Sequence, residues 1–173
     1  STHYHRLATE LFLSAALLAE RNGHSFSSEF CQRLERMIDA VRWFSHPDGT
    51  APVVGDQDNG RVHRLMVWQN PEREWLDFRP LVAIGAIWKQ NPEWAAWSTQ
   101  WREEAVWMFG GRDLEIFQQK PQAMTEIPHL VEYPEGGWYI LQNDHFHVLA
   151  ELGENGQNGM GGHAHNDTLS FDL

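Results

Sequence analysis

The sequence changes character at Gly110-Gly111, and this change limits the folds that are open to the chain. Before the two glycines, apolar residues recur every three or four positions, as they do on amphipathic helices. After them, prolines and short alternating runs replace the helical spacing, as in strands. Helices and strands in separate blocks are typical of an α+β fold, because βαβ units would mix the two patterns. We therefore expect several helices followed by antiparallel strands.

The first block predicts helices over residues 3–22, 72–90 and 92–109, and another that starts after Ser27 or Ser28 and ends before Pro47. The first two helices are joined by a short loop and should form an αα-hairpin. The apolar positions of the first helix, which we expect to face the core, are Tyr4, Leu7, Ala8, Leu11, Ala15 and Leu18. Tryptophans at helical spacing in the last helix (Trp94, Trp97, Trp101) are either core or a platform for sugar rings.

The second block predicts short strands. One covers residues 114–118, and two others, 138–141 and 145–152, should form a hairpin around the Asn143-Asp144 turn. Both faces of the strand at 145–152 carry apolar residues. We expect His145 and His147 to lie on its exposed side, at the edge of the sheet.

Composition excludes some classes of function. The chain has 24 acidic and 13 basic residues, a formal net charge of -11, which does not suit nucleic acid. An anionic polysaccharide would need a local cluster of arginine and histidine to overcome this field. No apolar run approaches the roughly 18 residues that span a membrane, and the single cysteine rules out an internal disulfide.

Residues 161–173 hold the densest group of potentially catalytic side chains, with His163, His165 and Asp167 at every second position. In an extended chain these three side chains share one face, and Leu169 and Phe171 should continue that face as core. Glycines precede the histidines, so the chain can turn sharply there. The pattern indicates either a site at the rim of a sheet or a surface strand with solvated side chains.

A second polar segment, residues 52–61, is too rich in Gly, Asp and Asn to be a helix. Its Asp56 and Asp58 concentrate oxygen ligands, but the spacing and the glutamate of an EF-hand calcium loop are missing. With Arg61 close by, the segment is either a loop that contacts a substrate or a solvated turn.

The run Gly-His-Ala-His-Asn-Asp-Thr-Leu-Ser-Phe at residues 162–171 resembles the signature of the heparinase II/III-like family of bacterial polysaccharide lyases. Residues 137–141 and 147–153, which lead into it, resemble that family too. The N-terminal Ser-Thr-His-Tyr-His-Arg-Leu, residues 1–7, is similar to the motif of the family's helical domain.

This resemblance implies the C-terminal part of an (α/α) toroid over residues 1–111, the first strands of an antiparallel β-sandwich over 112–173, and a cleft between them. It implies a lyase that cleaves uronic-acid-containing glycans, such as a glycosaminoglycan or alginate, by β-elimination. His163 would then face the substrate as base or carboxylate contact, and His3 and Tyr4 are the other catalytic candidates. The loop residues Asp56, Asp58 and Arg61, together with Arg6, are the substrate-binding candidates.

The resemblance also touches on metal binding. His165 matches a histidine that binds zinc in several members, but the other ligands of such a site would lie beyond Leu173. Asp167 would orient a motif histidine through a hydrogen bond. No other cofactor is implied.

The chain departs from the family at the tyrosine that serves as acid and base after the second helix, since Asp56, Asp58 and Arg61 occupy that region. Two alternatives therefore stay open. One is a glycoside hydrolase on an (α/α) toroid that uses Asp56 and Asp58 as acid and base. The other is a non-catalytic glycan-binding or exopolysaccharide-assembly protein.

The chain starts within a helical pattern and stops within a strand pattern, so we expect it to be an internal segment of a larger protein. The expected partner is an anionic polysaccharide, with no nucleic acid and no membrane span. By resemblance alone, the location is the bacterial periplasm or the outside of the cell. The oligomeric state is left open.

Overall fold

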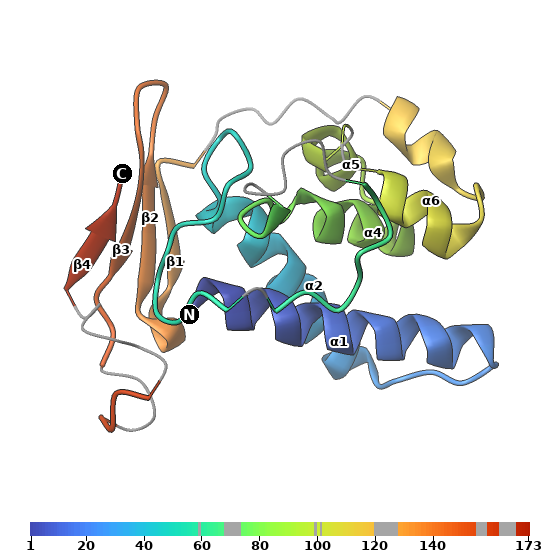
Figure 1. Cartoon of the computed structure of the whole chain (residues 1–173), viewed down its shortest axis with the longest axis horizontal. Coiled ribbons are helices and arrows are strands. Elements are labelled where there is room, and N and C mark those ends of the chain that lie inside the picture. Colours follow the sequence, from blue (N-terminus) through green and yellow to red (C-terminus); the bar gives the residue numbers. More distant parts are fainter. Residues whose placement is uncertain are drawn as a thin grey trace.

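The computed structural model describes residues 1–58, 60–67, 74–98, 100, 102–119, 128–154, 159–162 and 169–173. Within these ranges the helices are α1 (Thr2–Arg21), α2 (Ser28–Phe44), α4 (Arg79–Lys89), α5 (Pro92–Ser98) and α6 (Glu103–Phe109). The strands are β1 (Leu130–Tyr133), β2 (Trp138–Gln142), β3 (His147–Glu151) and β4 (Ser170–Asp172). Figure 1 shows the helices gathered on one side and the sheet on the other. The expected α+β fold is confirmed.

The hairpin of α1 and α2 forms as predicted, because the end of α1 and the start of α2 carry local signals. The Ser27 side chain accepts a hydrogen bond from the backbone N–H of Phe30 and so caps the start of α2. At the end of α1, Asn22 closes the last turn and Gly23 adopts a φ of +76°. The two helices pack against each other and against α4.

The bounds predicted for the helices over 72–90 and 92–109 are wrong. The helix α4 begins only at Arg79, with Pro80 in its first turn, where the missing N–H of proline costs nothing. The second prediction splits into α5 and α6, and α6 starts with Glu103 and Glu104, whose charges suit a helix N-terminus.

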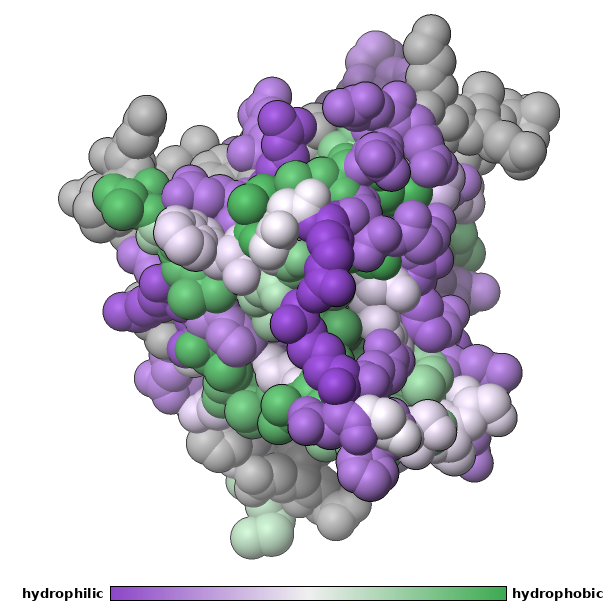
Figure 2. All heavy atoms as spheres, turned by 90° about the vertical axis from the view of Figure 1, so that its right-hand side faces the viewer, coloured by the Kyte–Doolittle hydropathy of each residue, from purple (hydrophilic) through white to green (hydrophobic). Residues whose placement is uncertain are grey.

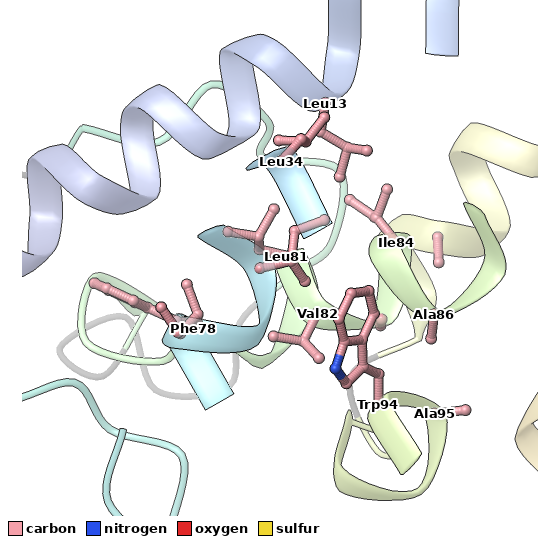
Figure 3. Close-up of a cluster of buried hydrophobic side chains, with 14 of the residues drawn as sticks. Leu13, Leu34, Phe78, Leu81, Val82, Ile84, Ala86, Trp94 and Ala95 are labelled. Carbon is pink, nitrogen blue, oxygen red and sulfur yellow. The ribbon is translucent and has the colours of Figure 1, made fainter. Parts of the chain in front are cut away.

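The core is centred on α4, which is apolar nearly all round. Figure 3 shows Leu81, Val82 and Ile84 of this helix among Leu13 of α1, Leu34 of α2 and Trp94 of α5. Trp94 is buried and donates its indole N–H to Asp39, and Trp97 packs against the same core. These two tryptophans are therefore core residues rather than a sugar platform, and Trp101 lies outside the described residues.

The sheet has the order β1-β2-β3-β4, with every neighbouring pair antiparallel. The hairpin of β2 and β3 closes as predicted, because the Asn143 side chain accepts from the backbone N–H groups of His145 and Phe146. The predicted strand over 114–118 is wrong. That segment is a 3-10 helix (Leu114–Gln118) that follows Asp113 in a left-handed conformation and buries Ile116.

The assignment of faces in β3 is also wrong. His147 is 7% exposed and donates from Nε2 to the carbonyl of Trp43, because the helices cover the face that it shares with Leu149. The opposite face is exposed, and it carries Phe171, which is 73% exposed although we expected core. Leu169, with a φ of +61°, is exposed too. Since β4 pairs with β3, this strand is not at the edge.

The face of the molecule opposite the sheet carries hydrophobic patches broken up by polar residues (Figure 2). Within the described residues, no helix combines the length and the apolar character that crossing a bilayer requires.

Candidate functional site: a cleft between the first helix and the sheet

A cleft of about 770 Å³ opens where the N-terminus of α1 meets the sheet. Figure 1 shows this N-terminus beside the sheet. Helices contribute Ser1, His5, Arg36 and Ala40, and the loop after α2 contributes Val54. The sheet end contributes Glu132, Tyr133, Pro134, Glu135, Gly136, Trp138, Glu151 and Glu154. A volume in the range of 300–1,000 Å³ is typical of small-ligand sites, so the cleft has room for sugar rings.

His5 is the titratable residue that the first turns of α1 present to this cleft. Its Nε2 donates to the carbonyl of Met37 at 2.8 Å, which fixes the neutral tautomer with an unprotonated Nδ1. Within the described part of the chain Nδ1 makes no hydrogen bond. Burial lowers the pKa of His5, opposed in part by the bond to Met37. The geometry is that of an imidazole held ready to accept a proton.

The ring of His5 is held in place by aromatic neighbours. Its centroid lies 5.6 Å from that of Phe44, edge to face, and 6.2 Å from that of Trp138. Trp138 itself packs edge to face on Phe44. Because Phe44 is fully buried, this contact ties the cleft wall to the core.

His3, the histidine expected from the sequence, lies elsewhere. It is 1% exposed. Its ring is tilted against that of Trp75 and edge to face with that of Phe78, and its Nε2 lies 3.2 Å from the carbonyl of Trp75. Burial, followed by the charge of Arg6, lowers the pKa of His3 to about 4. The structure does not bring His3 to the cleft, and its contacts are those of a core residue.

Tyr4 and the loop of residues 55–58 do come together. The Tyr4 hydroxyl donates to Asp58 at 2.8 Å, and this hydrogen bond raises the pKa of the tyrosine. Ser1 donates from Oγ to the carbonyl of Asp56. The loop thus rests on the first turn of α1, next to Val54 in the cleft wall.

Arg6 and Arg61 are placed inside the molecule, with side chains only 1% exposed. Arg61 pairs with Glu104 at 2.5 Å, and Arg6 lies 3.8 Å from Glu10 and donates to the carbonyl of Trp75. The two carboxylates also accept backbone N–H groups of the loop at 62 and 65. This charged cluster fastens the loop to α1 and α6, and neither arginine lines the cleft.

The same cluster corrects the predicted face of α1. Leu11 and Leu18 are exposed, whereas Thr2, His3, Arg6, Thr9, Glu10, Leu13, Ala16 and Leu17 are buried. The spacing of apolar residues predicted the wrong buried side of α1, because polar side chains with specific partners occupy part of the side that is buried. Burial raises the pKa of both Glu10 and Glu104.

His163, His165 and Asp167 lie outside the described residues. The described residue that follows them, Leu169, donates its backbone N–H to the carbonyl of Glu151 at 2.8 Å, and Glu151 lines the cleft. Among the described residues, no three His, Cys, Asp or Glu side chains are arranged to hold a metal ion.

Sequence reasoning missed the cleft residues His5, Arg36, Trp138 and Glu151. A signal existed for His5, since it lies four residues after Ser1 and therefore on the same side of the helix. The other three belong to α2, β2 and β3, and only the packing of these elements brings them together.

Two family comparisons match the chain. The sequence model of the heparinase II/III N-terminus matches residues 1–81, and that of the heparinase II/III-like C-terminal region matches residues 125–173. The matches fall on the two sides of the cleft, the helical hairpin and the sheet. No curated protein and no solved structure matches the chain. Because the two models together cover about three quarters of the sequence, the chain belongs to the heparinase II/III-like family.

Proposed function

We propose that this chain is part of a polysaccharide lyase that cleaves uronic-acid-containing glycans by β-elimination in the cleft between α1 and the sheet. The observation that carries the proposal is the neutral His5 in the lining of a cleft large enough for sugar rings, since its Nε2 bond to Met37 leaves Nδ1 unprotonated. Membership of the heparinase II/III-like family supports the same reaction class.

The reaction makes three demands, and the chain offers a group for each. A cation must neutralise the uronate carboxylate so that the C5 proton becomes acidic, and Arg36 is the arginine in the described lining. A base must take that proton, and in this proposal the unprotonated Nδ1 of His5 takes it. The C5–H electron pair then forms the C4–C5 double bond as the C4–O bond breaks.

The departing glycosidic oxygen needs a proton. We assign this role to Tyr4, which precedes His5 in the sequence and whose hydroxyl donates to Asp58, a hydrogen bond that raises the pKa of the tyrosine. His163 joins the site in this proposal as a contact to the uronate carboxylate, supported by the bond between Leu169 and the cleft residue Glu151.

The experiment follows ultraviolet absorbance of the 4,5-unsaturated uronate product with a panel of uronic polysaccharides. His5→Gln keeps an N–H that can reach the Met37 carbonyl but removes the base, so we expect kcat to fall by about 10²- to 10⁴-fold. The matched control is His24→Gln, at an exposed position after α1. Full activity of His5→Gln would remove His5 from the mechanism.

His163→Ala tests the role of His163 separately from that of His5. It should abolish turnover while the urea unfolding midpoint stays that of the wild type, and undiminished turnover would exclude a role for His163. If the panel gives new reducing ends without absorbance, hydrolysis replaces elimination, and Asp56 and Asp58 become the residues to test.

A further inference from the structure

Two aromatic side chains of the sheet line the cleft, and the proposed reaction uses neither. Tyr133 of β1 and Trp138 of β2 are paired directly in the antiparallel register, so their side chains lie next to each other on one face of the sheet. Both are half-buried, and both pack against the core that the helices share with the sheet. The two rings therefore form one aromatic wall of the cleft.

The hydroxyl of Tyr133 has a proton to donate and makes no hydrogen bond within the part of the chain that the structure describes. The charge that acts on it is that of Asp39 in α2, whose two carboxylate oxygens accept the indole N–H groups of Trp43 and Trp94. Burial, followed by the charge of Asp39, raises the pKa of Tyr133, so the phenol stays protonated at neutral pH. Because a half-buried phenol usually has a hydrogen-bond partner, a ligand in the cleft is the natural acceptor.

The indole of Trp138 is held in one orientation by its neighbours. It lies edge to face with the buried Phe44, with ring centroids 5.4 Å apart, and its centroid is 6.2 Å from that of His5. A sugar ring has a face of C–H groups that packs on an aromatic ring, and a rim of hydroxyl oxygens that accept hydrogen bonds. Trp138 and Tyr133 together offer a partner for each, next to His5.

We infer that Tyr133 and Trp138 form a sugar subsite on the sheet wall of the cleft. Trp138 stacks on the ring of one sugar unit, and Tyr133 donates a hydrogen bond to a ring hydroxyl of the same unit. This inference rests on the proposed function and adds specificity-determining contacts to it. Since Arg36 binds the uronate carboxylate and His5 takes the proton, the pair binds the substrate without acting in the chemical step. Loss of either contact should therefore raise KM and leave kcat unchanged.

Tyr133→Phe tests the hydrogen bond, because it removes the hydroxyl and keeps the ring that packs against the core. The probes are hyaluronan, alginate and heparan sulfate. Turnover is followed by ultraviolet absorbance, and binding by calorimetry on the full chain carrying His5→Gln, so that no substrate is consumed. We expect KM and Kd to rise by about three- to tenfold, with kcat within about twofold of the wild type and the same urea unfolding midpoint. The matched control is Tyr139→Phe, which should change none of these values, since Tyr139 lies on the opposite face of the sheet.

Trp138→Phe tests the stacking. It keeps a ring next to Phe44 but presents a smaller face to the sugar, so Kd should rise by about two- to tenfold without a change in kcat. A carboxyl-reduced form of the probe that binds then locates the contact of the phenol. Tyr133→Phe should weaken binding of the reduced and the native polymer by the same factor. A loss confined to the native polymer would place the phenol on the carboxylate and overturn the assignment to a ring hydroxyl.

The outcomes separate this inference from the proposed function. Weaker binding by Tyr133→Phe and Trp138→Phe, with no unsaturated product from the wild type, would uphold the subsite and overturn the lyase reaction. Turnover with unchanged KM in both variants would overturn the subsite and leave the reaction standing. A fall in kcat without a change in Kd would also overturn the subsite, because the phenol would then act in the chemical step. Binding of none of the three polymers would overturn it as well.

Discussion

The sharpest test of the structure is the pH dependence that it assigns to His3. Because this histidine is buried between Trp75 and Phe78 and its pKa is lowered from 6.5 to about 4, the folded protein keeps it neutral over a range where the unfolded chain protonates it. The unfolded state then binds more protons, so stability is present at neutral pH and is lost as pH falls through 6.5. With pKa values of 6.5 and 4, linkage gives a loss of about 2 kcal/mol between pH 7 and pH 5.

The perturbation is His3→Gln, which keeps an N–H able to reach the carbonyl of Trp75 but cannot titrate. Loss of the ring contacts should lower stability by a constant amount at every pH. Urea unfolding followed by tryptophan fluorescence, at several pH values from 5 to 8, gives the free energy of unfolding of both proteins. The difference between wild type and His3→Gln should shrink by about 2 kcal/mol from pH 7 to pH 5.

His24→Gln serves as the control, because an exposed histidine should leave the pH profile of the wild type unchanged. His5, His63 and His147 also have lowered pKa values, so the wild type should lose more than the share of His3 on acidification. A His3→Gln variant whose stability runs parallel to the wild type from pH 8 to pH 5 would refute the burial of His3.

Three further predictions concern the elements that shape the cleft, each measured by urea unfolding. Gly137→Ala should cost about 3 kcal/mol, because Gly137 has a φ of +71° and an added Cβ would meet Cα of Gly153; an unchanged midpoint would contradict this close approach. Leu149→Ala should cost about 3 kcal/mol, since this side chain is 1% exposed between the sheet and the helices, and a loss below about 1 kcal/mol would mean that this face is not packed. Ser27→Ala should cost about 1 kcal/mol through loss of the α2 cap, whereas Ser27→Asp should retain the wild-type stability.

Local chemistry explains why some elements could be predicted from the sequence. The end of α1 depends on Asn22 and Gly23, and the start of α2 depends on Ser27. Their side chains or backbone preferences act on residues within one turn. The Asn143 turn is local in the same way. The order of helices before strands follows from apolar spacing, which needs no knowledge of partners.

Elements with apolar residues on two faces could not be oriented from the sequence. Along β3, both Phe146 with Val148 and His147 with Leu149 make acceptable inner faces, and the helices cover the second pair. Along α1, the inner stripe includes Arg6 and Glu10. Such charges are tolerated inside a protein only with partners. Besides their mutual ion pair, Arg6 and Glu10 form hydrogen bonds with Trp75 and Val62, more than 50 residues away in the chain.

The residues of the candidate site also fall into those predicted from the sequence and those that depend on packing. From the sequence we predicted site residues in the first turn of α1, the 55–61 loop and the 163–167 motif, and of these Tyr4 does contact Asp58. Which histidine at the start of α1 lines the cleft depends on how the elements pack, since His3 and His5 differ by two positions and so by about 200° around the helix. Trp138 of β2 packs on Phe44 of α2 and next to His5, and these contacts between distant segments cannot be read from a linear pattern.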